Sequence, residues 1–241
     1  MSKDMENSAR GGKLGQMRWM FNRIAPSYDF LNHLFTLNID QLWRRRLARM
    51  VAQERPKQVL DLATGTADLA IALARKLPEA EILGLDISTE MMAVGEKKIC
   101  KAGLEQRITL DEGNAEALTQ GDESFDAVTV GFGVRNFDHL AQCFAEMHRV
   151  VRKGGRVAIL ELSTPRNRFV RAFYNGYAHR FMPWLGGLIS HDKAAYRYLP
   201  ASISAFHRPE RVVEMLTEAG FKQVEAHKQL FGIAYIYLAV K

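Results

Sequence analysis

Short apolar segments alternate with helical segments from Lys57 onward, and this alternation is the feature that most restricts the fold. Apolar runs typical of buried strands occupy residues 58–63, 81–86, 107–110, 125–130 and 156–162. Helical periodicity fills the intervals, from about 68 to 76, 89 to 102 and 138 to 151. Strands that alternate with helices of this length predict βαβ units, right-handed crossovers and a parallel sheet.

The end of the chain departs from a simple parallel pattern. A helical segment over 208–219 precedes two further strands, 221–227 and 233–240, joined by a short turn that contains Gly232. We therefore expect a doubly wound α/β fold with a seven-stranded, mostly parallel sheet whose last strand is antiparallel. An ordinary dinucleotide-binding sheet ends differently.

Two segments lie outside the alternation. Residues 1–55 predict a segment of N-terminal helices, the first of them broken at Pro26. Residues 56–241 form the main domain, and 164–203 interrupt it with three prolines and a Gly-Gly pair. We interpret this interruption as an inserted helical cap over the substrate.

Composition narrows the class of protein. The 241 residues are 47% hydrophobic, enough to build a packed core. No run of about 18 uncharged apolar residues predicts a membrane-spanning helix, and the N-terminus lacks the apolar region of a signal peptide. We therefore expect a cytoplasmic protein. Cys100 and Cys143 are expected in the core, and no residues have the spacing of metal ligands.

Charge is distributed unevenly along the chain. Residues 1–55 carry ten basic against five acidic residues, and 163–200 carry six against one, whereas 56–162 are acidic. Both basic segments are rich in aromatic residues, a combination typical of nucleic-acid or anionic-membrane surfaces and also of solvated helix faces over an aromatic core. The basic residues flank the acidic part instead of forming one stripe, which argues against nucleic acid.

A cofactor-binding turn follows the first strand of the main domain. Gly65 permits a close approach of the backbone to a ligand, and Asp86 ends the next strand, 21 residues later. An acidic residue at that place accepts hydrogen bonds from ribose hydroxyls, in NAD and in S-adenosylmethionine alike.

Two features favour S-adenosylmethionine over a dinucleotide. The turn has one glycine and an acid, Asp61, in the strand before it, whereas a pyrophosphate favours several glycines with open backbone N–H groups. S-adenosylmethionine carries no phosphate, and its cationic amino-acid end tolerates a carboxylate. The segment 113–116, Gly-Asn-Ala-Glu, follows the third strand, where a contact to the adenine edge is expected. Asp61 is alternatively a capping or buried hydrogen-bonded carboxylate.

The chain resembles the quinone-biosynthesis C-methyltransferase family, which methylates the ring of demethylmenaquinol or of a ubiquinone precursor. Four stretches carry the resemblance, and together they extend it from Phe21 to Lys241: Tyr-Asp-Phe-Leu-Asn at 28–32 with Trp43, Leu-Asp-Leu-Ala-Thr-Gly-Thr-Ala-Asp at 60–68, Phe-Gly-Val-Arg-Asn at 132–136, and Tyr-Arg-Tyr-Leu-Pro-Ala-Ser-Ile at 196–203. The resemblance implies a class I S-adenosylmethionine methyltransferase fold.

The resemblance also implies which residues contact the cofactor, namely Thr66, Asp86, Asn114 and Ala115. A serine of the family falls on Gly131, which has no side chain to make that contact. Asn38 stands where a glycine is usual, and Asp40 where a histidine is usual. A role for a histidine at position 40 therefore does not carry over.

Methyl transfer to ring carbon requires an aligned donor, an activated quinol and exclusion of water. A nearby cation lowers the pKa of a phenolic hydroxyl, ordinarily about 10. Arg135 follows the fourth strand at the ligand-binding edge and is the predicted cation; the alternative is an ion pair with a carboxylate such as Asp138. Asn136 is predicted to orient the hydroxyl or a water, and Tyr28 to close the site unless it is a packed aromatic.

The sequence leaves two alternative roles for Glu161 and two for the pair His191-Asp192. Glu161, at the end of the fifth strand, either hydrogen-bonds substrate or caps a loop. The pair His191-Asp192 is either a base dyad or, more often for such a pair, a turn.

The sequence thus predicts ring C-methylation of a prenylated quinol by S-adenosylmethionine, most simply demethylmenaquinol to menaquinol. Alternatives are a polyprenyl methoxybenzoquinol of ubiquinone biosynthesis, another small-phenol methyltransferase, a nicotinamide oxidoreductase and a non-catalytic binding protein. A prenyl tail lies in the membrane, so we expect peripheral contact with its inner face through the basic aromatic segments. We expect no nucleic-acid partner and leave a homodimer open.

Overall fold

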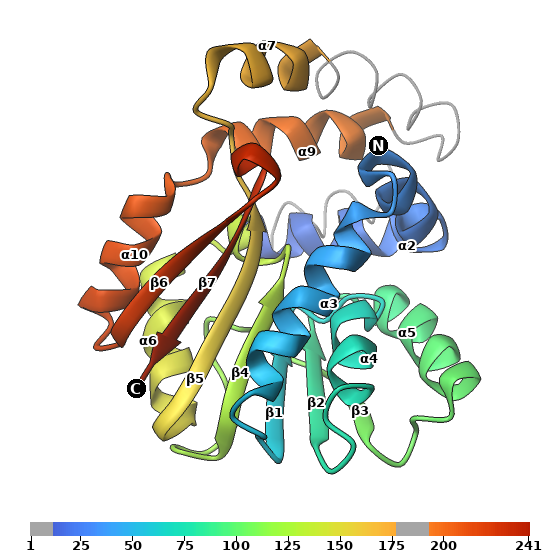
Figure 1. Ribbon diagram of the computed structural model, residues 1–241. Helices are drawn as coiled ribbons and strands as arrows, with labels where there is room; N and C mark the ends of the chain where they lie inside the picture. Colours follow the sequence, from blue (N-terminus) through green and yellow to red (C-terminus); the bar gives the residue numbers. More distant parts are fainter. Residues whose placement is uncertain (1–11, 177–192) are drawn as a thin grey trace.

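The computed structural model describes residues 12–176 and 193–241, and its centre is a seven-stranded sheet in the order β3-β2-β1-β4-β5-β7-β6 (Figure 1). The neighbouring pairs among β1 to β5 are parallel, whereas β7 is antiparallel to both β5 and β6. This confirms the predicted doubly wound α/β fold. The strands are β1 Gln58–Leu62, β2 Glu81–Asp86, β3 Ile108–Glu112, β4 Phe125–Gly131, β5 Val151–Leu162, β6 Lys222–Gln229 and β7 Ala234–Val240.

Helices cover both faces of the sheet, because the strands carry apolar side chains on both faces that must be buried (Figure 1). Val59 faces α3, Ile39–Ala52, and α4, Asp68–Ala74, and this core extends to α5, Thr89–Ala102. The next residue, Leu60, faces the second core under α6, Leu140–Val150, and α10, Pro209–Glu218. Strand β2 lies on one side of β1, and β4, which comes later in the chain, lies on its other side. The strand order therefore reverses at β1, and ligands of open α/β sheets bind at such a reversal.

Strand β5 is longer than its apolar run predicts. It begins at Val151, five residues before the predicted start at Arg156, and includes the polar residues Arg152 and Lys153. The pairing with β4 shifts register between Phe125 and Ala127. A register shift lets a polar, glycine-containing segment continue the strand, and a search for buried apolar runs misses such a segment.

The predicted break at Pro26 is wrong. Helix α2 runs without interruption from Gly12 to Thr36, with Pro26 inside it. Proline removes one helical hydrogen bond, which normally kinks or ends a helix. Here the residues on both sides are fixed by a core of their own, in which Ile24, Ala25, Leu31 and Phe35 pack with Met91 of α5. This packing holds the helix across the missing bond.

The segment after β5 contains helices, as expected of a cap. Helix α7, Arg168–Gly176, and helix α9, Lys193–Ala205, lie beyond the carboxyl ends of the parallel strands (Figure 1). The pair His191-Asp192 lies outside the described residues. Division of the chain at residue 56 and the bounds of the cap at 164–203 stay predictions.

The two cysteines differ in burial. Cys143 on α6 lies in the core, as predicted, but Cys100 is exposed on α5, so that prediction is wrong. Cys100 follows the buried Ile99 by one position, and consecutive helical positions point about 100° apart. Among residues 12–176 and 193–241, no helix combines the length and apolar character needed to cross a membrane.

Candidate active site

The turn between β1 and α4 has an unusual backbone. Ala63, Gly65 and Ala67 adopt positive φ angles of 51°, 55° and 63°. Only glycine takes this left-handed conformation without strain, and an L-residue there costs roughly 1–2 kcal/mol. In this tight turn, Ala63 and Ala67 therefore adopt the same left-handed conformation as Gly65. It directs the backbone toward the end of β2.

Asp86 fixes this turn from the end of β2. Its carboxylate accepts hydrogen bonds from the backbone N–H of Gly65 at 2.7 Å and of Ser88 at 2.8 Å. Burial raises the pKa of Asp86, and these backbone donors oppose the rise. Asp86 thereby joins the turn to the adjacent strand, at the place where a ribose contact is predicted.

A cavity lies at the carboxyl edge of the sheet, beneath α2. Its lining includes most of the predicted site residues: Tyr28, Gly65, Asp86, Asn114, Ala115, Gly131 and Asn136. We call it the main cavity. Asn114 keeps its position through its side-chain oxygen, which accepts from the backbone N–H of Glu116 at 3.0 Å. The residues that the sequence assigns to adenosine thus meet in one space.

A second, smaller cavity adjoins the main cavity, and Tyr28, Ala63, Gly65 and Gly131 line both. We call it the inner cavity. Asp61 and Thr66, the two predicted cofactor residues absent from the main lining, are found here. Together the two cavities contain every residue that the sequence assigns to the cofactor.

Asp61 is a buried carboxylate in this inner cavity, 1% exposed. It accepts hydrogen bonds from the hydroxyls of Thr64 at 2.7 Å and Thr129 at 2.6 Å. Burial raises its pKa to about 6, because these two hydroxyls stabilise the anion less than water does. A cationic group bound beside Asp61 would hold it ionised.

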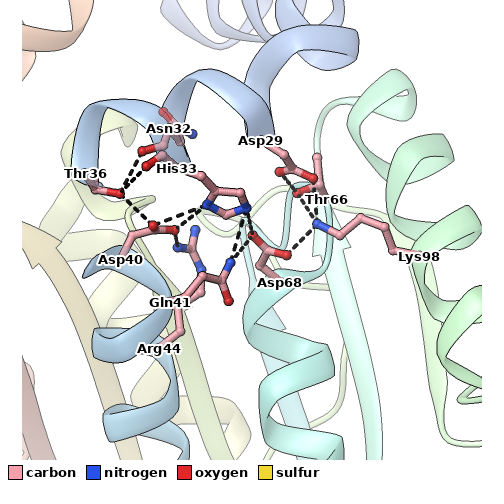
Figure 2. Close-up of polar contacts among 10 residues, drawn as sticks. All are labelled: Asp29, Asn32, His33, Thr36, Asp40, Gln41, Arg44, Thr66, Asp68 and Lys98. Carbon is pink, nitrogen blue, oxygen red and sulfur yellow. Dashed lines mark hydrogen bonds and ion pairs between the residues drawn. The ribbon is translucent and has the colours of Figure 1, made fainter. Parts of the chain in front are cut away.

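Thr66 belongs to a polar network that ties the N-terminal helices to the turn (Figure 2). Its hydroxyl donates to Asp29 of α2 at 2.5 Å. The ammonium of Lys98 on α5 lies 2.6 Å from Asp29 and 2.5 Å from Asp68 of α4. Three helices are therefore joined through one lysine next to the predicted cofactor contact.

His33 extends this network into α3 (Figure 2). Its Nδ1 lies 3.0 Å from a carboxylate oxygen of Asp40, and its Nε2 lies 3.6 Å from one of Asp68. Asp40 also accepts from Thr36 at 2.6 Å and from Arg44 at 2.6 Å. The histidine absent at position 40 thus has a counterpart at position 33, facing that same position. Asn38, where the family has glycine, takes a left-handed φ of 61°.

The hydrogen bond that His33 donates to Asp40 raises the pKa of His33 above its ordinary 6.5, and the charges of Asp40, Asp68 and Asp29 add to this rise. A raised pKa means that protonated His33 stabilises the fold fully below about pH 6.5, and that this stabilisation is lost as pH rises through the folded-state value. We expect His33→Gln to lower the melting temperature at pH 6 and to have a smaller effect at pH 8.5. Thermal unfolding of both proteins across this range measures the difference. His207→Gln, at an exposed histidine, is the control, and an equal loss at both pH values would contradict the prediction.

Arg135 lies in a short 3-10 helix, Val134–Asn136, directly after β4. The guanidinium pairs with the fully buried carboxylate of Glu161, Nη1 to Oε1 at 2.8 Å, and also donates to the carbonyl of Phe132. Burial disfavours the charge, but Glu161, Tyr28 and Tyr198 together outweigh burial and raise the pKa of Arg135. The ion pair considered from the sequence exists, with Glu161 in place of Asp138. Asp138 lies 3.5 Å from Lys13.

Glu161 is thereby assigned a structural contact, since it holds both the side chain and the backbone N–H of Arg135. The two hydrogen bonds of the guanidinium both come from Nη1 of Arg135. Its Nε is buried and has no hydrogen-bond partner within the described residues. Arg135 lines a third cavity, with Tyr28, Arg44 and Leu162, which we call the outer cavity. An unpaired buried donor is costly, so a ligand acceptor is expected there.

Tyr28 lines all three cavities. Burial raises the pKa of its hydroxyl, and the charges of Arg135 and Arg44 oppose the rise. Asn136 accepts a hydrogen bond from the hydroxyl of Tyr198 on α9 at 3.1 Å, which links the cap to the main cavity.

Several residues of this site were missed by the sequence analysis. Tyr198 belongs to a recognised motif, which is the only signal that indicated it. Arg44 stands in sequence beside Arg45 and Arg46, and nothing in the sequence distinguishes it from them, yet it is buried, 6% exposed. Asp29 lies in the motif at 28–32, but nothing in that motif indicated its partners. Lys98 carries no local signal, because its contacts to Asp29 and Asp68 join helices that lie apart in the sequence.

Comparison with known proteins gives a consistent result. The model of the ubiE/COQ5 methyltransferase family matches residues 9–241. The demethylmenaquinone methyltransferase of Bacteroides fragilis is 41% identical over 96% of this chain and 94% of its own. That of Thermus thermophilus is 43% identical over 91% and 98%. A Geobacter sulfurreducens protein, named ubiquinone/menaquinone biosynthesis C-methyltransferase, is 40% identical over 94% and 88%.

Solved structures show the same fold at low sequence identity. A SAM-dependent methyltransferase from Aquifex aeolicus aligns with a TM-score of 0.57 at 16% identity, over 80% of this chain and 88% of its own. An O-methyltransferase family protein from Burkholderia thailandensis aligns with a TM-score of 0.66 at 16% identity, over 88% and 58%. These likenesses show the class I methyltransferase fold that the sequence predicted.

Proposed function

The chain belongs to the ubiE/COQ5 methyltransferase family, and from this premise we propose that it transfers a methyl group from S-adenosylmethionine to a ring carbon of demethylmenaquinol. The names of the Bacteroides and Thermus relatives support this acceptor. The name of the Geobacter relative also includes ubiquinone biosynthesis, so a polyprenyl methoxybenzoquinol is the second candidate.

The main and inner cavities fit S-adenosylmethionine by the chemistry of their groups. Asp86 ends β2 with a carboxylate suited to ribose hydroxyls, and Asn114 and Ala115 follow β3 near the adenine position. Asp61, Gly65 and Thr66 line the space for the amino-acid end, whose ammonium suits a carboxylate held only by hydroxyls. Gly131 contributes only backbone. When bound, S-adenosylmethionine supplies an electrophilic methyl group on sulfur.

The acceptor is activated by loss of a proton from a hydroxyl next to the reacting carbon. The observation that carries this part of the proposal is the buried Nε of Arg135, which has no partner among the described residues and belongs to a side chain that lines the outer cavity. A hydrogen bond from this cationic group stabilises a phenolate and lowers the pKa of the quinol. Because Glu161 neutralises much of the charge, the directed N–H group is the larger contribution. Asn136 orients the hydroxyl or a water, and Tyr28 closes the site.

The experiment is quinone analysis by mass spectrometry in a strain that lacks this gene. Accumulation of demethylmenaquinone, reversed by the wild-type gene, is the expected result. Accumulation of an unmethylated methoxybenzoquinol would instead support the second candidate. An unchanged quinone profile would refute both.

We also propose that the end of the molecule formed by α2, α7 and the β6–β7 connection contacts the anionic inner face of the membrane. Phe30, Leu37, Phe169 and Phe231 are 60–76% exposed, an unusual exposure for large apolar side chains. The guanidinium of Arg168 lies over the ring of Phe169 at 5.5 Å, so charge accompanies the apolar surface. Helix α2, helix α7 and the β6–β7 connection lie at the same end of the molecule (Figure 1).

Flotation with vesicles tests this contact. We expect recovery with vesicles that contain phosphatidylglycerol, little recovery with pure phosphatidylcholine, and a decrease at high salt. The double variant Leu37→Ser and Phe231→Ser should float less, whereas Glu79→Ser, between α4 and β2, should float like the wild type. Equal partitioning onto both kinds of vesicle would contradict the proposal.

A further inference from the structure

Arg44 is a buried cation at the boundary between the inner and outer cavities. It projects from α3, outside the sheet, and its Nη1 donates to Asp40 at 2.6 Å (Figure 2). Its guanidinium lies 4.8 Å from the centre of the Phe132 ring. Within the described part of the chain, that bond to Asp40 is its only hydrogen bond. Several N–H groups of the guanidinium are therefore available to a ligand.

The charged residues that line the main and inner cavities indicate which charged groups of a ligand could bind there. Among the described residues that line the main and inner cavities, Arg44 is the only lysine or arginine. The inner cavity also contains two carboxylates, Asp61 and Asp68. Asp68 is already paired with Lys98 at 2.5 Å, whereas Asp61 accepts hydrogen bonds only from hydroxyls and feels the charge of Arg44 without an ion pair to it. The space therefore offers one carboxylate without a direct cationic partner and one cation with unused donors.

The amino-acid end of the methyl donor is a zwitterion with complementary groups. Its α-ammonium needs an acceptor and its α-carboxylate needs a donor, and both must lose water on entering a buried space. Resting on the proposed function, we infer that Arg44 binds the α-carboxylate of the donor while Asp61 accepts its α-ammonium. The N-terminal segment thus completes the cofactor site.

A competing role for Arg44 comes from the outer cavity, which it also lines with Arg135. There it would contact a quinol oxygen and act on the acceptor. The two roles differ in the ligand that responds to a substitution. If Arg44 binds the carboxylate, its substitution changes the affinity only of ligands that carry the carboxylate. If Arg44 binds the quinol, its substitution changes only the KM for the acceptor.

Calorimetry with three ligands separates these roles: S-adenosylhomocysteine, its decarboxylated analogue, and methylthioadenosine, which lacks the amino-acid end. We expect the wild type to bind S-adenosylhomocysteine about 10- to 100-fold more tightly than the decarboxylated analogue, the range of a charge-assisted hydrogen bond. In Arg44→Gln this ratio should fall to about threefold or less, with unchanged affinity for methylthioadenosine. Arg45→Gln, at an exposed neighbour on α3, should retain the wild-type ratio.

Two results would overturn the inference. One is a wild-type protein that binds the first two ligands equally. The other is an Arg44→Gln variant that keeps the wild-type ratio, whether its affinities fall together or only the KM for the quinol rises. Arg44→Lys retains the charge if the glutamine variant does not fold, and we expect an intermediate ratio.

The outcome also separates this inference from the proposed function. A wild type that binds none of the adenosyl ligands refutes the methyltransferase proposal itself. Tight binding of S-adenosylhomocysteine with no selectivity for its carboxylate refutes only the role of Arg44.

Discussion

Replacement of Arg135 by lysine is expected to reduce kcat about 100- to 1000-fold, the usual loss when one positioned donor is removed from a site of developing negative charge. Lysine preserves a cation opposite the buried Glu161 but lacks the Nε–H group, which has no protein partner in the described structure. Affinity for S-adenosylhomocysteine should stay within about twofold, because Arg135 lines neither the main nor the inner cavity.

Transfer of a labelled methyl group to demethylmenaquinol measures kcat, and calorimetry measures cofactor affinity. Arg135→Ala is a poorer test, since removing one partner of a buried ion pair costs about 3–5 kcal/mol of stability. Combining it with Glu161→Gln removes the unpaired charge and provides a matched control for folding. Full activity in Arg135→Lys, or a loss of cofactor affinity that parallels the loss of turnover, would contradict the assigned role.

Replacement of Asp86 by alanine is expected to weaken binding of S-adenosylhomocysteine by at least about 100-fold. The substitution removes the predicted ribose contact and also leaves the N–H groups of Gly65 and Ser88 without their acceptor. Each hydrogen bond to a charged group contributes about 1.5–3 kcal/mol, so the loss of one from the ligand already approaches this factor.

Calorimetry or equilibrium dialysis measures the affinity. Glu81→Gln is the control, because Glu81 begins the same strand at its opposite, exposed end. Asp86→Asn keeps an acceptor oxygen and should lose less affinity than alanine. Retention of affinity within threefold in Asp86→Ala would show that the ribose lies elsewhere.

The parts of the fold that follow local rules could be predicted from the sequence. The strand over residues 81–86 could be predicted because its apolar run is a local signal of a strand buried between two layers of helices. The helix over 89–102 was predicted with its observed bounds, and Ser88 caps it by accepting from the N–H of Met91 at 3.2 Å. Continuation of α2 through Pro26 could not be predicted, because it depends on packing against α5 that is remote in sequence.

The same distinction applies to the site. Residues that follow strands of a parallel sheet meet at one edge, so Gly65, Asp86 and Asn114 could be brought together by topology alone. Arg135 and Glu161 are 26 residues apart in the sequence, and their pairing depends on the register between the neighbouring strands β4 and β5. Arg44 reaches the cofactor region from a helix that precedes the sheet, and neither periodicity nor charge distinguishes it from the exposed arginines beside it.

The left-handed turn at Ala63 also restricts how this protein can evolve. A methyl group at position 133 would lie 2.7 Å from the side chain of Ala63 and 3.0 Å from that of Val130, too close for both groups to remain in place. The loops after β1 and β4 therefore share room for a single methyl group. A methyl group at position 133 therefore requires glycine at position 63 and a shift of Val130, so we expect the residues at positions 63 and 133 to covary.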